Sequence, residues 1–135
     1  RPNGVQASAD GRTIYVNLYL ENAVAAFARD SGRELWRTAV KGAPDNMSIT
    51  PGGQLLSAVH PVSLARIRDE CLSRDIELCE LPFIVYAIDP VSGAARELHA
   101  GSGAPIGGVT VAVESGGQIY LGAYAGNRLG RMPAR

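Results

Sequence analysis

The chain has 135 residues, which is enough for one compact domain with a core of its own. Thirteen basic residues balance thirteen acidic ones, which argues against a basic nucleic-acid-binding stripe and against an acidic solvating tail. The apolar runs are far too short for a membrane span. Composition therefore predicts a globular protein with no nucleic-acid partner and no transmembrane segment.

The chain begins Arg1-Pro2-Asn3, without an initiator Met or a signal peptide, and strand-like residues follow at once. Because this start falls inside a repeating pattern, we expect the true N-terminus to lie upstream.

Three segments share a pattern of strand, glycine turn, strand, short link and further strand. The first covers residues 4–35, and the third covers 108–133. The second begins as "MSITPGGQLLSAVHP" and resumes as "FIVYAIDPVSGAARELHAG". The main turn of each segment carries a two-residue hairpin signal: Asp10-Gly11, Gly52-Gly53 and Gly116-Gly117.

The segment 62–82, "VSLARIRDECLSRDIELCELP", interrupts the second repeat and is rich in charge and helix-forming residues. Without this segment, the second and third main turns are separated by nearly the same length of chain as the first and second. Repeats of about 40 to 45 residues with four short strands are typical of propeller blades. The sequence therefore predicts an all-β fold with this segment as a helical insertion between two strands.

The predicted architecture is a β-propeller segment of about three four-stranded blades, at about 1–42, 43–104 and 105–135. Propellers close with about four to eight blades, and an open array leaves strand edges and blade faces bare. We therefore expect a fragment that needs its missing N-terminal blades, or a second copy of itself, to complete a ring.

Cys71 and Cys79 lack the neighbours of a zinc site. On one helix they would lie about 12 Å apart, too far for a disulfide, whereas a looped segment would allow pairing. Both free thiols and a disulfide remain open.

Polar residues stand at matching positions of two repeats. Asn3 in "RPNGV" and Asp45 in "PDN" have the same separation in the chain as the first two main turns, and Asn46 follows Asp45. The matching "PIGG" of the third repeat has no polar side chain. In a propeller these positions face the central channel, where oxygen ligands suit calcium better than zinc. On spacing alone, ordinary turn chemistry is the favoured explanation of the same residues, ahead of a metal site.

His60 ends the strand "LLSAVH" before Pro61, a place where a lone histidine commonly has a supporting role. His99 is expected on the outer surface of a blade. Ser57 and Ser115 have no nucleophile-elbow context, which argues against serine hydrolysis.

The motifs "PNGVQASADGRTIYV", "PDNMSITPGGQLLSAVHP" and "GGVTVAVESGGQIYLGA" resemble the C-terminal half of paraoxonase-like propellers. That group is allied to the strictosidine-synthase-like proteins and, more distantly, to the senescence-marker/gluconolactonase proteins. The resemblance covers nearly the whole chain except the insertion.

The resemblance implies a six-bladed propeller with calcium at the mouth of its channel. It implies that Asn3, Asp45 and Asn46 are calcium ligands and that His60 lines the active-site pocket. The complete protein is then expected to be a lactonase or arylesterase-type hydrolase of lactones or esters. In that chemistry calcium polarises the carbonyl for attack by water.

The chain departs from this family in holding only half of the site, because further ligands and the water-activating histidines belong to preceding blades. The isolated chain is therefore expected to be inactive. Two alternatives are a non-catalytic propeller scaffold and a strictosidine-synthase-like protein without a required metal.

Two expectations concern the surroundings of the site. The insertion follows His60 closely and is expected to form part of a lid. The cysteine pair and a calcium site are typical of an oxidising compartment, so the sequence favours a periplasmic or secreted location.

Overall fold

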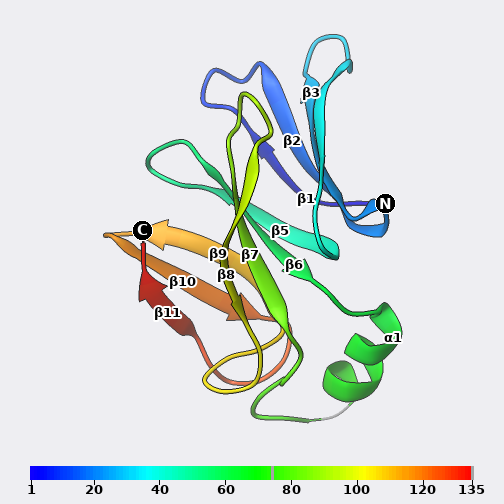
Figure 1. Cartoon of the computed structure of the whole chain (residues 1–135), viewed down its shortest axis with the longest axis vertical. Helices are drawn as coiled ribbons and strands as arrows, with labels where there is room; N and C mark the ends of the chain where they lie inside the picture. Colours follow the sequence, from blue (N-terminus) through cyan, green and yellow to red (C-terminus); the bar gives the residue numbers. More distant parts are fainter. Residues whose placement is uncertain (74, 135) are drawn as a thin grey trace.

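The computed structural model describes residues 1–73 and 75–134. Arg74, inside the predicted insertion, and Arg135, the end of the third predicted unit, lie outside the described residues. The described residues form three antiparallel sheets, one 3-10 turn and one short helical segment, so the predicted all-β class is confirmed (Figure 1).

Each sheet follows the order of the chain. The first contains β1 (Pro2–Ala7), β2 (Thr13–Leu18), β3 (Ala23–Ala28) and β4 (Glu34–Ala39), with a 3-10 turn η1 (Tyr19–Glu21) after β2. The second contains β5 (Ala43–Ile49), β6 (Leu55–His60), β7 (Phe83–Ile88) and β8 (Ala95–Gly101). The third contains β9 (Val109–Ser115), β10 (Gln118–Ala123) and β11 (Gly130–Pro133). Among the described residues it therefore has three strands, not the predicted four.

The first strands of the three sheets lie next to one another. The Gln6 side chain on β1 donates to the Met47 carbonyl on β5 at 3.1 Å. Ser48 on β5 donates to the Ala112 carbonyl on β9 at 2.6 Å. Strands β1, β5 and β9 thus form the inner row of a partial propeller, with the later strands of each sheet farther out.

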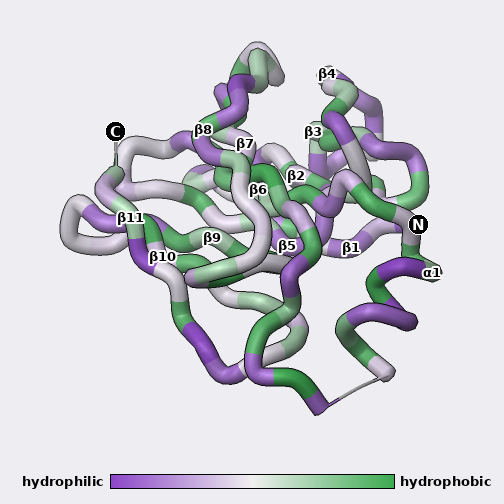
Figure 2. Tube along the Cα trace, turned by 60° about the horizontal axis from the view of Figure 1, so that its bottom comes forward, coloured by the Kyte–Doolittle hydropathy of each residue, from purple (hydrophilic) through white to green (hydrophobic). Residues whose placement is uncertain are grey.

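Two hydrophobic cores fill the spaces between the sheets. Tyr15 and Val24 of the first sheet pack against Leu55 and Ile88 of the second. Phe83 and other residues of the second sheet pack against the third in the same way. Every residue of β6 and β7 is buried, because these two middle strands of the second sheet lie between the first and third sheets (Figure 2).

The three predicted glycine turns all connect strands, but only Gly116-Gly117 forms a two-residue hairpin. The loops 8–12 and 50–54 are longer than predicted. Their side chains bond the loop backbone: Asp10 accepts from the Arg12 amide at 3.0 Å, and Thr50 accepts from the Gln54 amide at 3.0 Å. These local bonds stabilise a wider loop than the glycine pair alone indicates.

The insertion begins with a helix, α1 (Leu64–Ile67), which continues as a π-helical turn, η2 (Arg68–Leu72). Ser63 caps it by accepting from the Arg66 amide, as expected for Ser at this position. The chain then turns back, and Cys71 forms a disulfide with Cys79 across a Cα separation of 5.4 Å. The looped arrangement therefore applies, and the cysteines are paired.

The disulfide lies in a small separate core. Ile67, Cys71, Cys79 and Leu81 are buried together, with Tyr124 of the loop after β10 packed against them. A bridge between Leu78 and Gly126 joins the end of the insertion to the same loop, which connects β10 and β11 of the third sheet. The insertion is thus fixed to the third blade as well as to the second.

Within the described part of the chain, none of the helical segments has the length and apolarity that crossing a bilayer requires.

Candidate functional site

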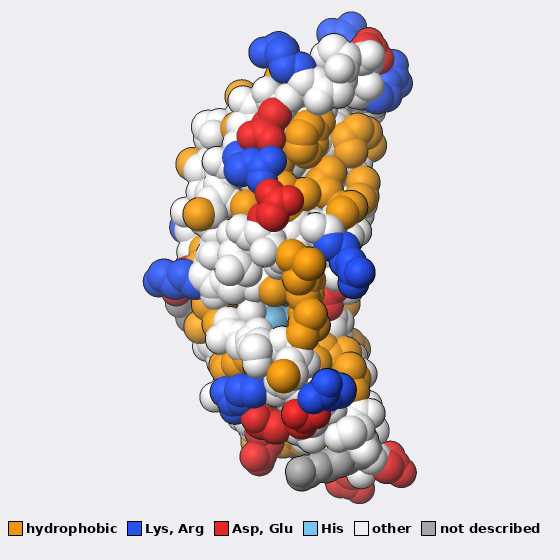
Figure 3. All heavy atoms as spheres, turned by 90° about the vertical axis from the view of Figure 1, so that its right-hand side faces the viewer, with side chains coloured by type: hydrophobic (Ala, Val, Ile, Leu, Met, Phe, Trp, Pro, Cys, Tyr) orange, Lys and Arg blue, Asp and Glu red, His pale blue; other side chains and the backbone are white. Residues whose placement is uncertain are grey.

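One pocket collects side chains from all three blades and from the insertion. It has a volume of about 430 Å³ and is of the size that small-molecule sites have. Arg1, Asn3, Asp45 and His60 supply charged or polar groups, and the remaining side chains are mainly apolar. The pocket lies on the side of the molecule that carries the N-terminus and α1, where Figure 3 shows hydrophobic side chains gathered above a charged cluster.

Backbone bulges place Asn3 and Asp45 at this pocket. In β1 the pairing with β2 shifts between Pro2 and Val5, and in β5 the pairing with β6 shifts between Pro44 and Met47. A bulge inserts an extra residue and redirects the side chains beside it. The two sequence-matched residues therefore occupy the same irregularity in neighbouring blades. In the third blade the corresponding shift falls at Thr110, beyond the "PIGG" motif.

Asp45 lies between Asn3 and His60. Asn3 Nδ2 donates to Asp45 Oδ1 at 2.5 Å, and Asp45 Oδ2 lies 3.9 Å from His60 Nε2. The structure thus brings together three of the four residues that the sequence singles out. Asn46, the fourth, is solvent-exposed and lies outside the lining of this pocket.

His60 is almost fully buried, with 2% of its side chain exposed. Its Nε2 lies 3.0 Å from the Val109 carbonyl, which can only accept, so Nε2 carries a proton. Its Nδ1 faces the Tyr19 hydroxyl at 3.5 Å. The rings of His60 and Tyr124 pack edge-on, with their centroids 5.2 Å apart. Histidine, two tyrosines and a backbone carbonyl thus join the three blades at one point.

Burial shifts the two titratable groups in opposite directions. Desolvation raises the pKa of Asp45, although the nearby His60 and the bond from Asn3 act against it. Desolvation lowers the pKa of His60, although the Asp45 charge opposes that shift. The histidine is therefore neutral near pH 7. A neutral imidazole carries no positive charge that could balance the negative charge of the Asp45 carboxylate.

A buried polar pair that the sequence analysis missed supports the Asp45 bulge. Asn17 on β2 donates from Nδ2 to the Asp45 carbonyl at 2.8 Å, and its Oδ1 accepts from Ser57 on β6 at 3.1 Å. Both side chains are fully buried. A polar residue inside the otherwise apolar run "TIYVNLYL" was the available signal.

We expect Asn17→Leu to destabilise the protein by about 1–3 kcal/mol, because it leaves the Ser57 hydroxyl and the Asp45 carbonyl without a partner. Urea unfolding measures this change. Asn127→Leu, at an exposed position, serves as the control. Equal stability of the two variants would contradict the role assigned to Asn17.

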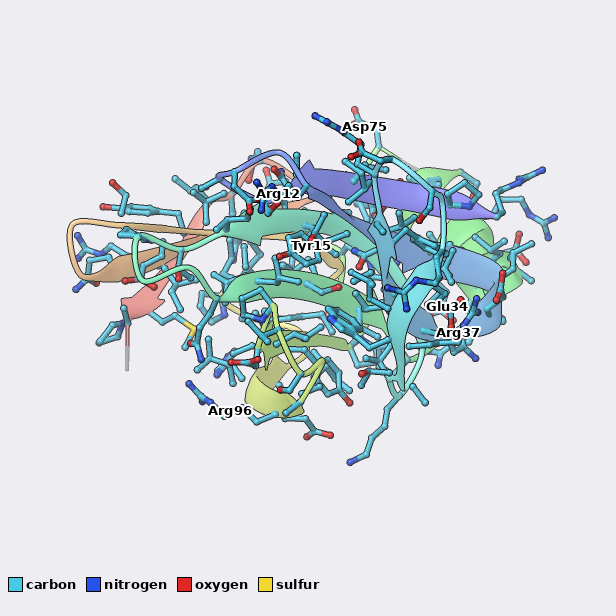
Figure 4. The ribbon with its side chains drawn as sticks, turned by 90° about the horizontal axis from the view of Figure 1, so that it is seen from above. Arg12, Tyr15, Glu34, Arg37, Asp75 and Arg96 are labelled. Atoms are coloured by element: carbon cyan, nitrogen blue, oxygen red, sulfur yellow. A yellow bond between two sulfur atoms is a disulfide. The ribbon has the colours of Figure 1, made fainter. Side chains whose placement is uncertain are left out.

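Tyr19 and Leu20 reach the pocket on η1, and an ion-pair network holds this turn. Arg37 on β4 bonds Glu34 through Nη2 at 2.7 Å and also pairs with Glu21 of η1. Figure 4 shows Glu34 and Arg37 side by side. Because all three charged groups are partly exposed, the network orients η1 more than it stabilises the fold.

Tyr124 enters the pocket from the loop after β10, and nothing in its local sequence distinguishes it. Its hydroxyl lies 3.5 Å from Cys79 Sγ, so the disulfide borders the site. Burial raises the pKa of Tyr124 to about 12, with smaller contributions from Tyr19 and Asp45. It therefore stays a neutral hydroxyl at physiological pH.

Comparisons with known proteins connect the fold to longer propeller-type proteins. No family model matches the sequence, and no curated protein matches it. Among solved structures, virginiamycin B lyase from Staphylococcus aureus superposes with a TM-score of 0.62 at 13% identity, over 98% of this chain and 38% of that one. A protein of unknown function from Bacteroides caccae gives 0.59 at 16% identity, over 96% and 44%.

A third match is a candidate 6-phosphogluconolactonase from Bacteroides fragilis, with a TM-score of 0.56 at 14% identity, over 90% of this chain and 32% of that one. The chain thus spans between 32% and 44% of the length of these structures. At such identities the matches bear on the fold alone. The chain is a partial β-propeller of the kind found in these larger proteins.

Proposed function

We propose that this chain supplies part of the active site of a propeller hydrolase that acts on lactones or esters. The observation that carries the proposal is the convergence of Asn3, Asp45 and His60 on one pocket at the inner strands. A carboxylate, an amide and a neutral imidazole beside apolar surface are suited to hold a carbonyl compound and water.

The donor set at the pocket fits part of a calcium shell. Asp45 offers carboxylate oxygens and Asn3 an amide oxygen, which are hard ligands of the kind calcium prefers. Calcium takes about six to eight oxygens, and the described residues contain no cluster of three or more acidic, His or Cys side chains. We therefore propose Asn3 and Asp45 as ligands, with the remaining ligands supplied by preceding blades.

Asn46 remains a predicted ligand by resemblance. Its side chain is exposed, so a ligand role requires a group beyond the pocket lining described above. We expect Asn46→Ala to weaken calcium binding less than a substitution at Asp45.

The residues of this chain have distinct roles in the proposed reaction. His60 lines the pocket with an unprotonated Nδ1 that can accept a hydrogen bond from the Tyr19 hydroxyl, and the water-activating histidines would come from preceding blades. Tyr19 and Tyr124 border that imidazole and limit the access of bulk solvent. Calcium, when bound, would polarise the substrate carbonyl and stabilise negative charge on its oxygen.

Ring completion is part of the proposal. Val5 and Leu35 on the first sheet and Val113 on the third are exposed large apolar residues. Sheet faces of this kind are covered by neighbouring blades in a closed propeller. We propose preceding blades of the same protein as the partner, and a second copy of this chain as the alternative.

The comparisons support the proposal at the level of the scaffold. One similar structure is a candidate 6-phosphogluconolactonase, and another is described as a luciferin-regenerating enzyme, with a TM-score of 0.52 at 16% identity. A third is a lyase, so proteins with this scaffold carry out different reactions. The reaction of this protein must therefore be inferred from its pocket residues and not from its fold.

The small number of donor groups favours a second candidate, a propeller that binds ligands without a metal or without catalysis. A strictosidine-synthase-like protein without a required metal belongs to this class. The Cys71–Cys79 disulfide bears on location in either case, and we propose a periplasmic or secreted protein because disulfides persist in oxidising compartments.

Calcium titration calorimetry on the full-length protein, followed by lactone and aryl ester hydrolysis with and without chelator, tests the proposal. We expect stoichiometric binding and activity that chelator removes and calcium restores. Calcium binding without hydrolysis, or hydrolysis that is insensitive to chelator, would favour the second candidate. The isolated chain is expected to be inactive.

A further inference from the structure

The pocket has an apolar part that the proposed chemistry does not use. Leu20 of η1 lines it together with Leu64 and Leu72, which stand at the two ends of the helical stretch formed by α1 and η2. Their exposed fractions are 59%, 54% and 56%. A scattered exposed leucine needs no explanation, but three that share one pocket indicate a binding surface.

We propose that the disulfide-bonded insertion is the specificity-determining wall of this pocket, and that Leu64 and Leu72, with Leu20, bind an alkyl or aryl group of the ligand. The inference rests on the proposed function for the other end of the ligand, the carbonyl group near Asp45 and His60. The occupant is a small molecule because these leucines and the polar groups line the same cavity of about 430 Å³.

The fold of the insertion explains how the wall is positioned. Ile67 and Cys71 are buried in the small core against which Tyr124 packs, and Ile67 also borders the pocket, whereas Leu64 and Leu72 are exposed and line the pocket. Cys71 directly precedes Leu72, so its bond to Cys79 fixes the backbone that carries this leucine. Tyr124 contacts both the disulfide and His60, which links the wall to the polar end.

Charge at the outer face of the insertion fits this orientation. Arg66 pairs with Glu70 at 2.6 Å, and Arg68 pairs with Asp69 at 2.6 Å. All four side chains are solvated. The helical stretch is therefore amphipathic, and its apolar residues divide between the small core and the pocket.

Calorimetric binding of 5-alkyl-2-pyrrolidinones to the full-length protein tests this inference without depending on catalysis. These lactams carry the ring carbonyl but resist hydrolysis. From methyl to hexyl, we expect affinity to rise by up to about fourfold per methylene group, the factor for full burial of one CH₂. In the double variant Leu64→Ser/Leu72→Ser this dependence on chain length should largely disappear, while the methyl compound binds as before.

Leu129→Ser is the matched control, because Leu129 is 70% exposed and lies outside this pocket. Cys71→Ser/Cys79→Ser tests the disulfide, and we expect a reduced chain-length dependence with binding of the methyl lactam retained. Because Leu64 and Leu72 are exposed, their replacement leaves the fold intact, which circular dichroism checks.

The outcomes separate the inference from the proposed function. Chain-length-dependent lactam binding that the Leu64→Ser/Leu72→Ser variant loses supports the wall, even if no lactone is hydrolysed. An unchanged dependence in that variant overturns the inference, even if lactones are hydrolysed. Failure of every lactam to bind also overturns it.

Discussion

Asp45→Asn is expected to lower calcium affinity and calcium-dependent hydrolysis by at least about 100-fold, since even loss of residues that only support metal ligands costs about 10- to 100-fold. The substitution removes the negative charge but keeps an oxygen that can accept from Asn3 Nδ2. The pocket should therefore keep its shape while losing its only acidic side chain among the described lining residues. Added calcium should restore activity only at concentrations raised by the same factor, if at all.

Calcium-dependent stabilisation measures this effect independently of activity. A ligand that binds only the folded state raises the melting temperature as its concentration increases. We expect calcium to raise the Tm of the wild type but not of Asp45→Asn. Asp89→Asn is the control, because this aspartate lies outside the pocket and bonds groups of its own turn, the Val91 and Ser92 amides and the Ser92 hydroxyl. A Tm shift that persists in Asp45→Asn would remove Asp45 from the proposed site.

In the absence of calcium, Asp45→Asn should not lower the stability of the folded protein. Desolvation raises the folded-state pKa of Asp45, so its ionised form destabilises the fold at pH values above that pKa. This cost is absent at pH values below the pKa of Asp in the unfolded chain. In chelator near pH 7, Asp45→Asn should be at least as stable as the wild type, and the difference should vanish as the solution is acidified.

Local signals were sufficient to predict most of the sheets. Glycine turns and the recurrence of similar segments predicted the inner hairpin of each blade, because those features act over a few residues. The loops at 8–12 and 50–54 were longer than predicted because Asp10 and Thr50 bond the backbone locally. The matching of Asn3 with Asp45 also emerged from the repeat, and the two β-bulges give it a structural basis.

Contacts between blades were not predictable in the same way. Asn17, Tyr19 and Tyr124 reach the site from blades other than the one that carries Asp45 and His60, so no short motif connects them with these two residues. The sequence left the pairing of Cys71 and Cys79 open, because it depended on where the helical stretch ends. Such residues are identified by the packing of whole blades and not by spacing.

Gly4→Ala is expected to destabilise the protein by about 1–3 kcal/mol, the usual cost of forcing extra atoms into a packed site. A Cβ at Gly4 would lie 2.6 Å from the Asp45 carbonyl oxygen and 2.8 Å from the Met47 amide nitrogen. These are backbone atoms of the neighbouring inner strand and cannot rotate away. The strands β1 and β5 would have to separate at the point where Asn3 meets Asp45.

The same displacement connects packing to the site, because it would lengthen the Asn3–Asp45 bond and move Asp45 relative to His60. Urea unfolding measures the stability change, and calcium calorimetry measures the effect on the site. Gly52→Ala is the matched control, since the nearest atom to a Cβ there, beyond the adjacent residues, would be the Thr50 hydroxyl at 3.8 Å. If Gly4→Ala matched Gly52→Ala in both measurements, the close approach of β1 to β5 would not be what holds Asn3 and Asp45 together.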